Sequence, residues 1–143
     1  FRMWKFRTMT TLDDGDTVRQ ATKGDDRVTR LGRILRKYSI DELPQLLNVI
    51  AGDMSLVGPR PHAVAPDRFF DKRIAMYPRR LNVKPGITGW AQVNGFRGAT
   101  ETDNCMAQRV EHDLYYIDNW SLLLDVYIVF LTVFSRKTSP TAY

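Results

Sequence analysis

The 143-residue chain lacks the residues that several common chemistries require. Its single cysteine, Cys105, excludes an intramolecular disulfide and is compatible with a reducing compartment. The two histidines, His62 and His112, lie far apart, and no Cys/His pair has zinc-ligand spacing, so we expect no zinc site. Neither a Walker A nor a Rossmann glycine pattern is present, and Ser39 and Ser55 have no nucleophile-elbow context. These absences exclude the most familiar sites for nucleotides, zinc and nucleophilic serine.

Long apolar runs are also missing. No stretch of about 20 apolar residues spans a bilayer, and no signal peptide is visible. The chain opens on Phe1 instead of methionine, directly in a strand-like run, so we expect it to be cut from a longer protein. The apolar run 122–134 is too short to cross a membrane. It predicts a buried helix or a helix at the lipid interface, although its Val and Ile content also permits a strand.

The composition favours one domain that covers residues 1–143, because 43% hydrophobic content is enough for a core. The net charge of +5 indicates an anionic partner: a nucleotide diphosphate, a nucleic acid or an acidic membrane surface. Charge is also divided along the chain. Residues 59–97 carry eight Lys and Arg against two acids, whereas residues 101–125 carry six acids and one Arg. We expect the acidic part to form a helix that packs on the basic part.

The pattern along the chain predicts an α+β fold, mainly helical, with a few short strands. Strands are expected at 1–9, 54–57 and 87–93, and helices at 28–38, from Pro66 to about Tyr77 with Pro78 ending it, and from about 103 to 117. The helix 28–38 has one apolar stripe and several Arg and Lys on its other faces. The acidic cluster at 13–16 lacks the full calcium-loop pattern, so we interpret it as a solvated loop.

The chain is organised around two adjacent acids, Asp41 and Glu42, between a basic segment and an apolar helix. Ser39 and Glu42 fit a capping box, which would start the helix just before the acids. Pro44 favours a start at Pro44 itself, which would leave the acids in the preceding turn. Either start keeps both carboxylates at a helix N-terminus. There they could merely favour the helix dipole, by about 0.3–1 kcal/mol each.

A wider pattern favours a chemical role for these acids. The run RKYSIDELPQLLNV (36–49) is followed by GDMSLVGPRP (52–61), preceded by KFRTM (5–9) and completed by KPGITGWAQVNG (84–95). Together these blocks resemble the bacterial sugar transferase family, the monotopic phosphoglycosyl transferases that load a sugar phosphate onto a polyprenyl phosphate. The resemblance covers nearly the whole chain. Members of this family carry a membrane-embedded helix upstream of the KFR block, and this chain lacks such a segment.

The resemblance implies a transfer of hexose-1-phosphate from a UDP-hexose to undecaprenyl phosphate, at the cytoplasmic face of the bacterial inner membrane. The resemblance also implies that Asp41 is the covalent nucleophile of this transfer, and that Glu42 is catalytic and ligates Mg²⁺. Arg36 and Arg60 suit phosphate contacts, because guanidinium offers forked donors. Further substrate contacts follow from motif position alone and fall on Lys5, Arg7 and Gln92. The endings GPRPHA, NGFRG and DLYYI resemble the branch that transfers glucose to initiate exopolysaccharide synthesis, although the hexose stays open between glucose, galactose and others.

Other interpretations remain at this point. The basic helix at 27–37 could bind a nucleic-acid groove, but that does not explain the acid pair or Pro59-Arg60-Pro61, so we expect no nucleic-acid partner. The chain could instead be a membrane-peripheral fragment without activity. The sequence leaves a homo-oligomer open.

Overall fold

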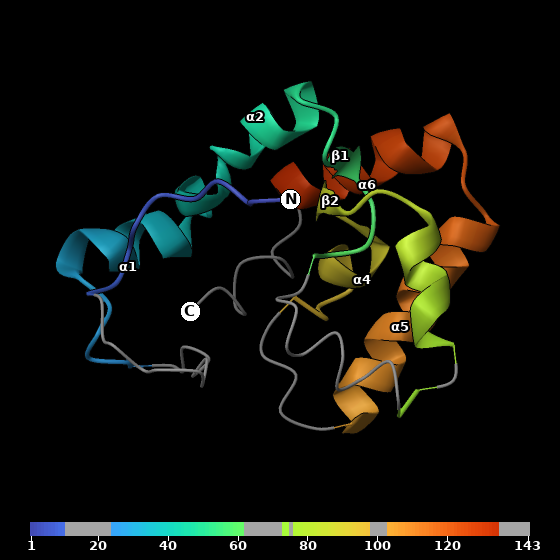
Figure 1. Cartoon of the computed structure of the whole chain (residues 1–143), viewed down its shortest axis with the longest axis horizontal. Helices are drawn as coiled ribbons and strands as arrows, with labels where there is room; N and C mark the ends of the chain where they lie inside the picture. Colours follow the sequence, from blue (N-terminus) through green and yellow to red (C-terminus); the bar gives the residue numbers. More distant parts are fainter. Residues whose placement is uncertain (11–23, 62–72, 75, 98–102, 135–143) are drawn as a thin grey trace.

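The structure of the chain is a computed structural model that describes residues 1–10, 24–61, 73–74, 76–97 and 103–134. The elements before the sheet are α1 (Arg30–Lys37), the 3₁₀ turn η1 (Ile40–Glu42) and α2 (Gln45–Ile50). The later helices are the 3₁₀ helix η2 (Tyr77–Asn82), α4 (Trp90–Val93), α5 (Asp103–Asp118) and α6 (Leu122–Phe134). In Figure 1, α1 and α2 lie on one side of the molecule and α5 on the other.

A small sheet lies between these two groups of helices (Figure 1). The strands β1 (Ser55–Val57) and β2 (Gly86–Thr88) pair in parallel, with Ser55 opposite Gly86 and Val57 opposite Thr88. In the described ranges, two short strands among seven helical segments confirm the predicted α+β class and its mainly helical character. The Gly58 position, just after β1, demands glycine, because a Cβ there would lie 2.6 Å from the Lys84 carbonyl oxygen.

Two hydrophobic clusters hold the helices to this sheet. The first packs α4, α5 and α6 on β1 through the buried side chains Val57, Val93, Tyr116 and Ile128. The second joins η2 to α5 through Tyr77, Met106 and Val110. The predicted helix from about 103 therefore exists, and its Met106 and Val110 stripe is buried as expected. It packs on the basic η2, which is the charge complementarity that the sequence predicts.

The N-terminal segment was predicted to be a strand, and this is wrong. Residues 1–9 make only one isolated antiparallel bridge, between Met9 and Val28. The segment is held instead by individual bonds: Asn48 accepts from the Trp4 N–H at 3.0 Å and donates to the Arg2 carbonyl at 2.8 Å. The aromatic and Met content of this segment therefore belongs to an extended chain laid over α2, without a strand partner.

The strand predicted at 87–93 is also only partly correct. It ends at Thr88, and the chain turns into α4 at Trp90 after an extended Gly89. The partner strand is exhausted there, because β1 ends at Val57 and Pro59 has no N–H to continue the ladder. Pro78, which was expected to end a helix, instead occupies the first turn of η2. The acidic cluster at 13–16 and the predicted helix start at Pro66 lie outside the described residues.

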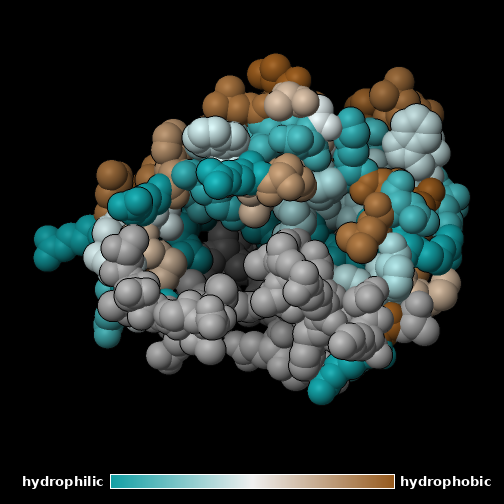
Figure 2. All heavy atoms as spheres, viewed as in Figure 1, coloured by the Kyte–Doolittle hydropathy of each residue, from teal (hydrophilic) through white to brown (hydrophobic). Residues whose placement is uncertain are grey.

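Much apolar surface stays uncovered in the described part of the chain. The helix at 122–134 is settled as α6, yet Ile128 is its one fully buried side chain. The apolar stripe of α1 is likewise exposed at Leu31 and Tyr38, and α2 exposes its leucines and Ile50 at 83%. Figure 2 shows apolar side chains gathered along the edge where α2 and α6 lie. Within the described residues, no helix is both long and apolar enough to cross a membrane.

Candidate active site

The acid pair lies in the η1 turn that links α1 to α2. Ser39 adopts a left-handed backbone with φ 57° and its side chain caps nothing, so the predicted capping box is wrong. Pro44 is the N-cap of α2, which leaves both acids in the turn before the helix, as in the second alternative. A 3₁₀ turn rotates successive side chains by about 120°, so the two carboxylates enter different surroundings.

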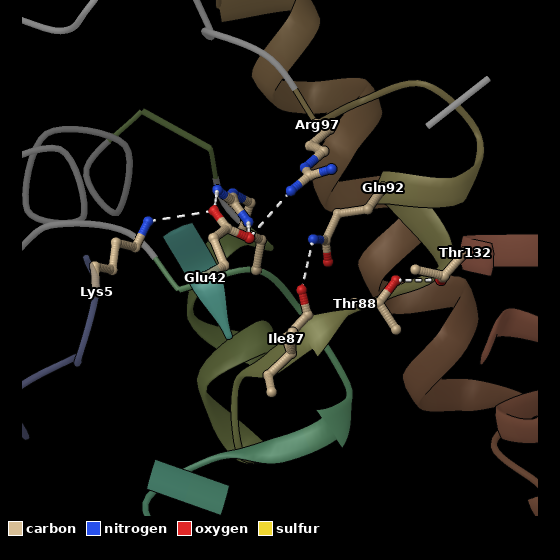
Figure 3. Close-up of polar contacts among 8 residues, drawn as sticks. Lys5, Glu42, Ile87, Thr88, Gln92, Arg97 and Thr132 are labelled. Carbon is tan, nitrogen blue, oxygen red and sulfur yellow. Dashed lines mark hydrogen bonds and ion pairs between the residues drawn. The ribbon is translucent and has the colours of Figure 1, made fainter. Parts of the chain in front are cut away.

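Glu42 is the centre of a cluster of cations (Figure 3). Arg60 donates hydrogen bonds to the Glu42 carboxylate from both of its terminal nitrogens, at 2.6 Å to Oε1 and 3.2 Å to Oε2. Lys5 reaches Oε1 at 3.3 Å, and Arg97 reaches Oε2 at 3.1 Å. The three cations come from the N-terminal segment, the chain after β1 and the loop after α4. Segments more than fifty residues apart in sequence therefore meet on one carboxylate.

Burial and charge act on Glu42 in opposite directions. Its side chain is 8% exposed, and this burial on its own acts to raise the pKa. The nearby Arg60, Lys5 and Arg97 outweigh burial and hold the pKa of Glu42 well below its ordinary value. Glu42 is therefore a fixed anion, and it keeps three positive side chains close together.

Asp41 has the contrasting environment. Burial, together with the negative charge of Glu42, raises the pKa of Asp41, while Lys5 and Arg36 act to lower it. In the part of the chain that the structure describes, its carboxylate makes no ion pair or hydrogen bond with another side chain. Its carbonyl accepts from the Phe6 N–H at 3.0 Å, which fixes the backbone. Asp41 thus presents a half-buried carboxylate with uncommitted lone pairs beside a cluster of cations.

The structure brings most of the predicted site residues together. Lys5 and Arg60 bind Glu42, and Arg36 lies near enough to Asp41 to act on its charge. Arg7 is exposed, and among the described residues it makes no ion pair or hydrogen bond. Arg7 therefore stays a prediction from motif position only.

Gln92 belongs to the wall of a cavity of about 580 Å³ that also contains Glu42 and Arg97. Its side chain is buried, and its amide N–H donates to the Ile87 carbonyl at 3.0 Å (Figure 3). Apolar side chains complete the wall, and they come from the start of α2, from β2 and from the end of α6: Leu43, Leu46, Ile87, Val133 and Phe134. The cavity is therefore lined by both charged and apolar side chains.

Arg97 is a site residue that the sequence prediction missed. It follows the Gln92 block in a loop that passes through Gly95 with a positive φ of 96°. The loop turns Arg97 back over Glu42, which a count of residues along the chain does not reveal. The signal was present, since Arg97 stands just beyond the family block that ends at Gly95.

A second, deeper group of charges lies behind Arg60. Arg80 and Asp113 are 3% and 2% exposed, and they form an ion pair of 3.0 Å between η2 and α5. Arg80 also donates to the Tyr77 hydroxyl at 2.9 Å and to the Arg60 carbonyl at 2.8 Å. Burial raises the pKa of Asp113 to about 6, although Arg80 and Arg109 oppose this.

The side chains, as arranged, do not form a magnesium site. A carboxylate has about four lone-pair sites, and the three cations already supply four contacts to Glu42. The described residues contain no group of three or more His, Cys, Asp or Glu side chains that could hold a metal. Magnesium ligation by Glu42 therefore stays a prediction, and it requires that Glu42 first release a cation.

The chain is similar in sequence to several known proteins. Residues 1–138 match the family described as bacterial sugar transferase. The chain is 57% identical, over its whole length, to a UDP-glucose:undecaprenyl-phosphate glucose-1-phosphate transferase of Caulobacter vibrioides, and covers 54% of that protein. It is 53% identical over 99% of its length to the Escherichia coli protein of the same name, and covers 31% of it.

A third relative has a different sugar in its name. It is a UDP-N-acetylgalactosamine-undecaprenyl-phosphate N-acetylgalactosaminephosphotransferase of Aeromonas hydrophila, 49% identical over 93% of the chain, which covers 31% of it. The chain thus spans 54% of the length of the first of these relatives and 31% of the length of the other two.

Proposed function

The chain belongs to the bacterial sugar transferase family, and from this premise we propose that it is the catalytic part of an undecaprenyl-phosphate sugar-phosphate transferase. Its donor would be a UDP-hexose and its acceptor undecaprenyl phosphate. The observation that carries this proposal is the contrast between the two acids. Glu42 is an anion bound by three cations, whereas Asp41 is a half-buried carboxylate that forms no ion pair with any residue that the structure describes.

The cation cluster supports the binding of a diphosphate. Phosphoryl transfer depends on positioning and on neutralising the charge of the phosphates. Lys5, Arg60 and Arg97 are already held close together by Glu42, so a diphosphate that approaches this cluster would meet preorganised donors. Of these three cations, Arg97 also lines the cavity beside Glu42. The forked guanidinium of Arg60 suits two phosphate oxygens.

In the proposed reaction, an Asp41 carboxylate oxygen attacks the phosphorus that bears the sugar. A new P–O bond to Asp41 forms, and the P–O bond to UMP breaks, so that UMP leaves with the bonding electrons. Carboxylates act as covalent nucleophiles in other phosphoryl transfers. The cations offset the repulsion between this carboxylate and the diphosphate. Arg36, whose charge also acts on Asp41, adds to this neutralisation.

In the second half of the reaction, Asp41 becomes the leaving group. An oxygen of undecaprenyl phosphate attacks the same phosphorus, the bond to Asp41 breaks, and Asp41 returns as a free carboxylate. The cavity supports such an acceptor, because its lining combines the charged Arg97 and Glu42 with the apolar Leu46, Val133 and Phe134. A phosphate head with an isoprenoid tail has the same division.

The family resemblance implies a magnesium ion, but the proposed steps depend on the side chains and substrates alone. An ion at this place would take most of its oxygens from the phosphates of the substrate, because Mg²⁺ prefers phosphate and a few carboxylate ligands. The saturated carboxylate of Glu42 would join only after a cation moved away.

We also propose glucose as the sugar and the membrane surface as a partner. Glucose rests on the two relatives at 57% and 53% identity, whose names specify UDP-glucose. The membrane rests on the apolar edge along α2 and α6 (Figure 2), where Ile50 and Leu123 are 83% and 81% exposed. A lipid acceptor and a nucleotide donor would meet at the cytoplasmic face of the inner membrane.

The deciding experiment measures UMP in the absence of the acceptor. The full-length protein that contains this chain is incubated with UDP-glucose alone. We expect release of UMP, no more than one per protein, with a sugar phosphate attached at Asp41 that disappears when undecaprenyl phosphate is added. Asp41→Asn should lose both the adduct and turnover, because an amide is a poor nucleophile. UMP release that strictly requires both substrates would contradict the covalent step.

A further inference from the structure

The segment Pro59-Arg60-Pro61 has few backbone N–H groups that can hydrogen-bond to the rest of the fold. Prolines on both sides of Arg60 have no N–H, so the segment is held mainly through what its carbonyl oxygens accept. The Pro59 carbonyl accepts from the Gly86 N–H at 2.9 Å, which ties it to the start of β2. The Arg60 carbonyl accepts from a side chain, the guanidinium of Arg80 at 2.8 Å.

Arg80 is itself fixed by all three of its nitrogens. Its Nε donates to Asp113 at 3.1 Å, one terminal nitrogen donates to the Tyr77 hydroxyl at 2.9 Å, and the other serves the Arg60 carbonyl. The group is almost fully enclosed, with Tyr77, Arg80 and Asp113 each 3% exposed or less. A buried and fully bonded guanidinium is a rigid donor.

We infer that Arg80 is a positioning residue for Arg60. Held by Asp113 and Tyr77, it fixes the backbone from which the Arg60 side chain reaches Glu42, and thereby sets where the phosphate-binding guanidinium lies. Arg80 touches no substrate in this scheme. The inference rests on the proposed function only in that Arg60 binds a substrate phosphate.

Adjacent arginines in η2 provide a matched control. Arg79 also pairs with an acid of α5, Asp118, at 2.6 Å, but both side chains are about half exposed. An exposed pair of this kind contributes little to stability. In both positions Arg→Lys keeps the charge and loses the planar fork, so the two variants differ only in burial and in the link to Arg60.

The test compares kcat/KM for UMP release in the full-length protein. We expect Arg80→Lys to lower kcat/KM by roughly 10- to 100-fold, the size of effect seen when a contact group is misplaced by about 1 Å. Arg79→Lys should leave it unchanged. The decisive step repeats Arg80→Lys in an Arg60→Ala background, where the second change should cost little, because the group that it positions is gone.

A purely structural Arg80 gives the opposite result. In that case Arg80→Lys would lower kcat/KM by the same factor in both backgrounds, or leave it unchanged with Arg60 present, and either outcome overturns the inference. If Arg80→Lys does not fold, Tyr77→Phe takes its place, since it removes one acceptor of Arg80 and keeps the ring.

Pyrophosphate separates this inference from the proposed function. If the wild-type protein releases no UMP from UDP-glucose, the proposed function fails, but the same cycle is then measured on pyrophosphate affinity by calorimetry. Loss of affinity in Arg80→Lys that vanishes in the Arg60→Ala background still supports the positioning role. Equal losses in both backgrounds overturn it.

Discussion

Replacing Glu42 by Gln tests whether this carboxylate holds the cation cluster together. The amide keeps the shape and one carbonyl oxygen but removes the negative charge. Lys5, Arg60 and Arg97 then face one another around a neutral group, in a place where the Glu42 side chain was 8% exposed. We expect the protein to fold with lower stability and to lose most of its turnover, because the three cations spread apart.

The size of the stability loss follows from the exposure of each partner. The Lys5 side chain is 36% exposed, so its pair contributes at most about 1 kcal/mol. Arg60 and Arg97 are 20% and 15% exposed, and hydrogen bonds to charged groups contribute about 1.5–3 kcal/mol each. The remaining amide oxygen keeps one such bond. The net loss is then about 2–3 kcal/mol, which lowers the melting temperature by roughly 10 °C in a chain of this size.

The pH dependence gives a second measure of the same interaction. Because the folded-state pKa of Glu42 lies below its ordinary value of 4.5, its stabilisation is present above that value and is lost as the pH falls. The difference in unfolding free energy between wild type and Glu42→Gln should therefore shrink below about pH 4.5. Chemical denaturation from pH 7 down to pH 3 would measure it.

Asp41→Asn is the matched control for this experiment. Burial and the charge of Glu42 raise the pKa of Asp41, so the fold disfavours its charged form, and a neutral amide should not lower stability at pH 7. The two variants remove one charge each from neighbouring positions. Equal losses of stability in both, or no loss in Glu42→Gln, would refute the assignment of Glu42 as the centre of the cluster.

Three further predictions concern residues outside the acid pair. Arg97→Ala should raise KM for the UDP-sugar about tenfold, since one charge-assisted bond to a phosphate is lost. It should also lower the melting temperature by several degrees, because the bond to Glu42 is lost as well. Steady-state UMP release and thermal denaturation measure these effects, and an unchanged KM would remove Arg97 from the site. Gly58→Ala should strongly destabilise the fold, because its Cβ meets the Lys84 carbonyl oxygen at 2.6 Å between rigid strand ends. Gly95→Ala, which has open space around it but a positive φ of 96°, should cost only about 1 kcal/mol in thermal denaturation.

The sequence predicted best where local pattern and packing agree. The Met106 and Val110 stripe predicted α5, and the reversal of charge along the chain predicted that α5 packs on basic residues, which Arg80 and Asp113 confirm. The sequence predicted worst where apolar residues have no partner. The aromatic and Met content of residues 1–9 is typical of a strand, but the start of the segment is held by bonds to the Asn48 side chain.

The sequence identified several residues of the site, but it did not show how they are arranged in space. The family blocks brought attention to Asp41, Glu42 and Arg60, and the structure places Arg60 on Glu42. A capping role for Glu42 was wrong, because three cations stabilise its carboxylate far more than one exposed N–H could. Arg97 and the Arg80–Asp113 pair depend on contacts between distant segments, and a linear pattern does not reveal which charges will meet.

The contribution of Lys5 to the site depends on how residues 1–9 are attached to the rest of the fold. Lys5 belongs to a segment that is held by hydrogen bonds of the Trp4 and Phe6 amides and of the Asn48 side chain. Arg60 instead follows β1, and Arg97 follows α4. We expect the N-terminal segment to open at a lower free energy than the core and to form a separate unit in hydrogen exchange. Each opening would remove Lys5 from Glu42 and leave the two arginines in place. The cation cluster would then have a three-cation state and a two-cation state, with populations set by the N-terminal segment.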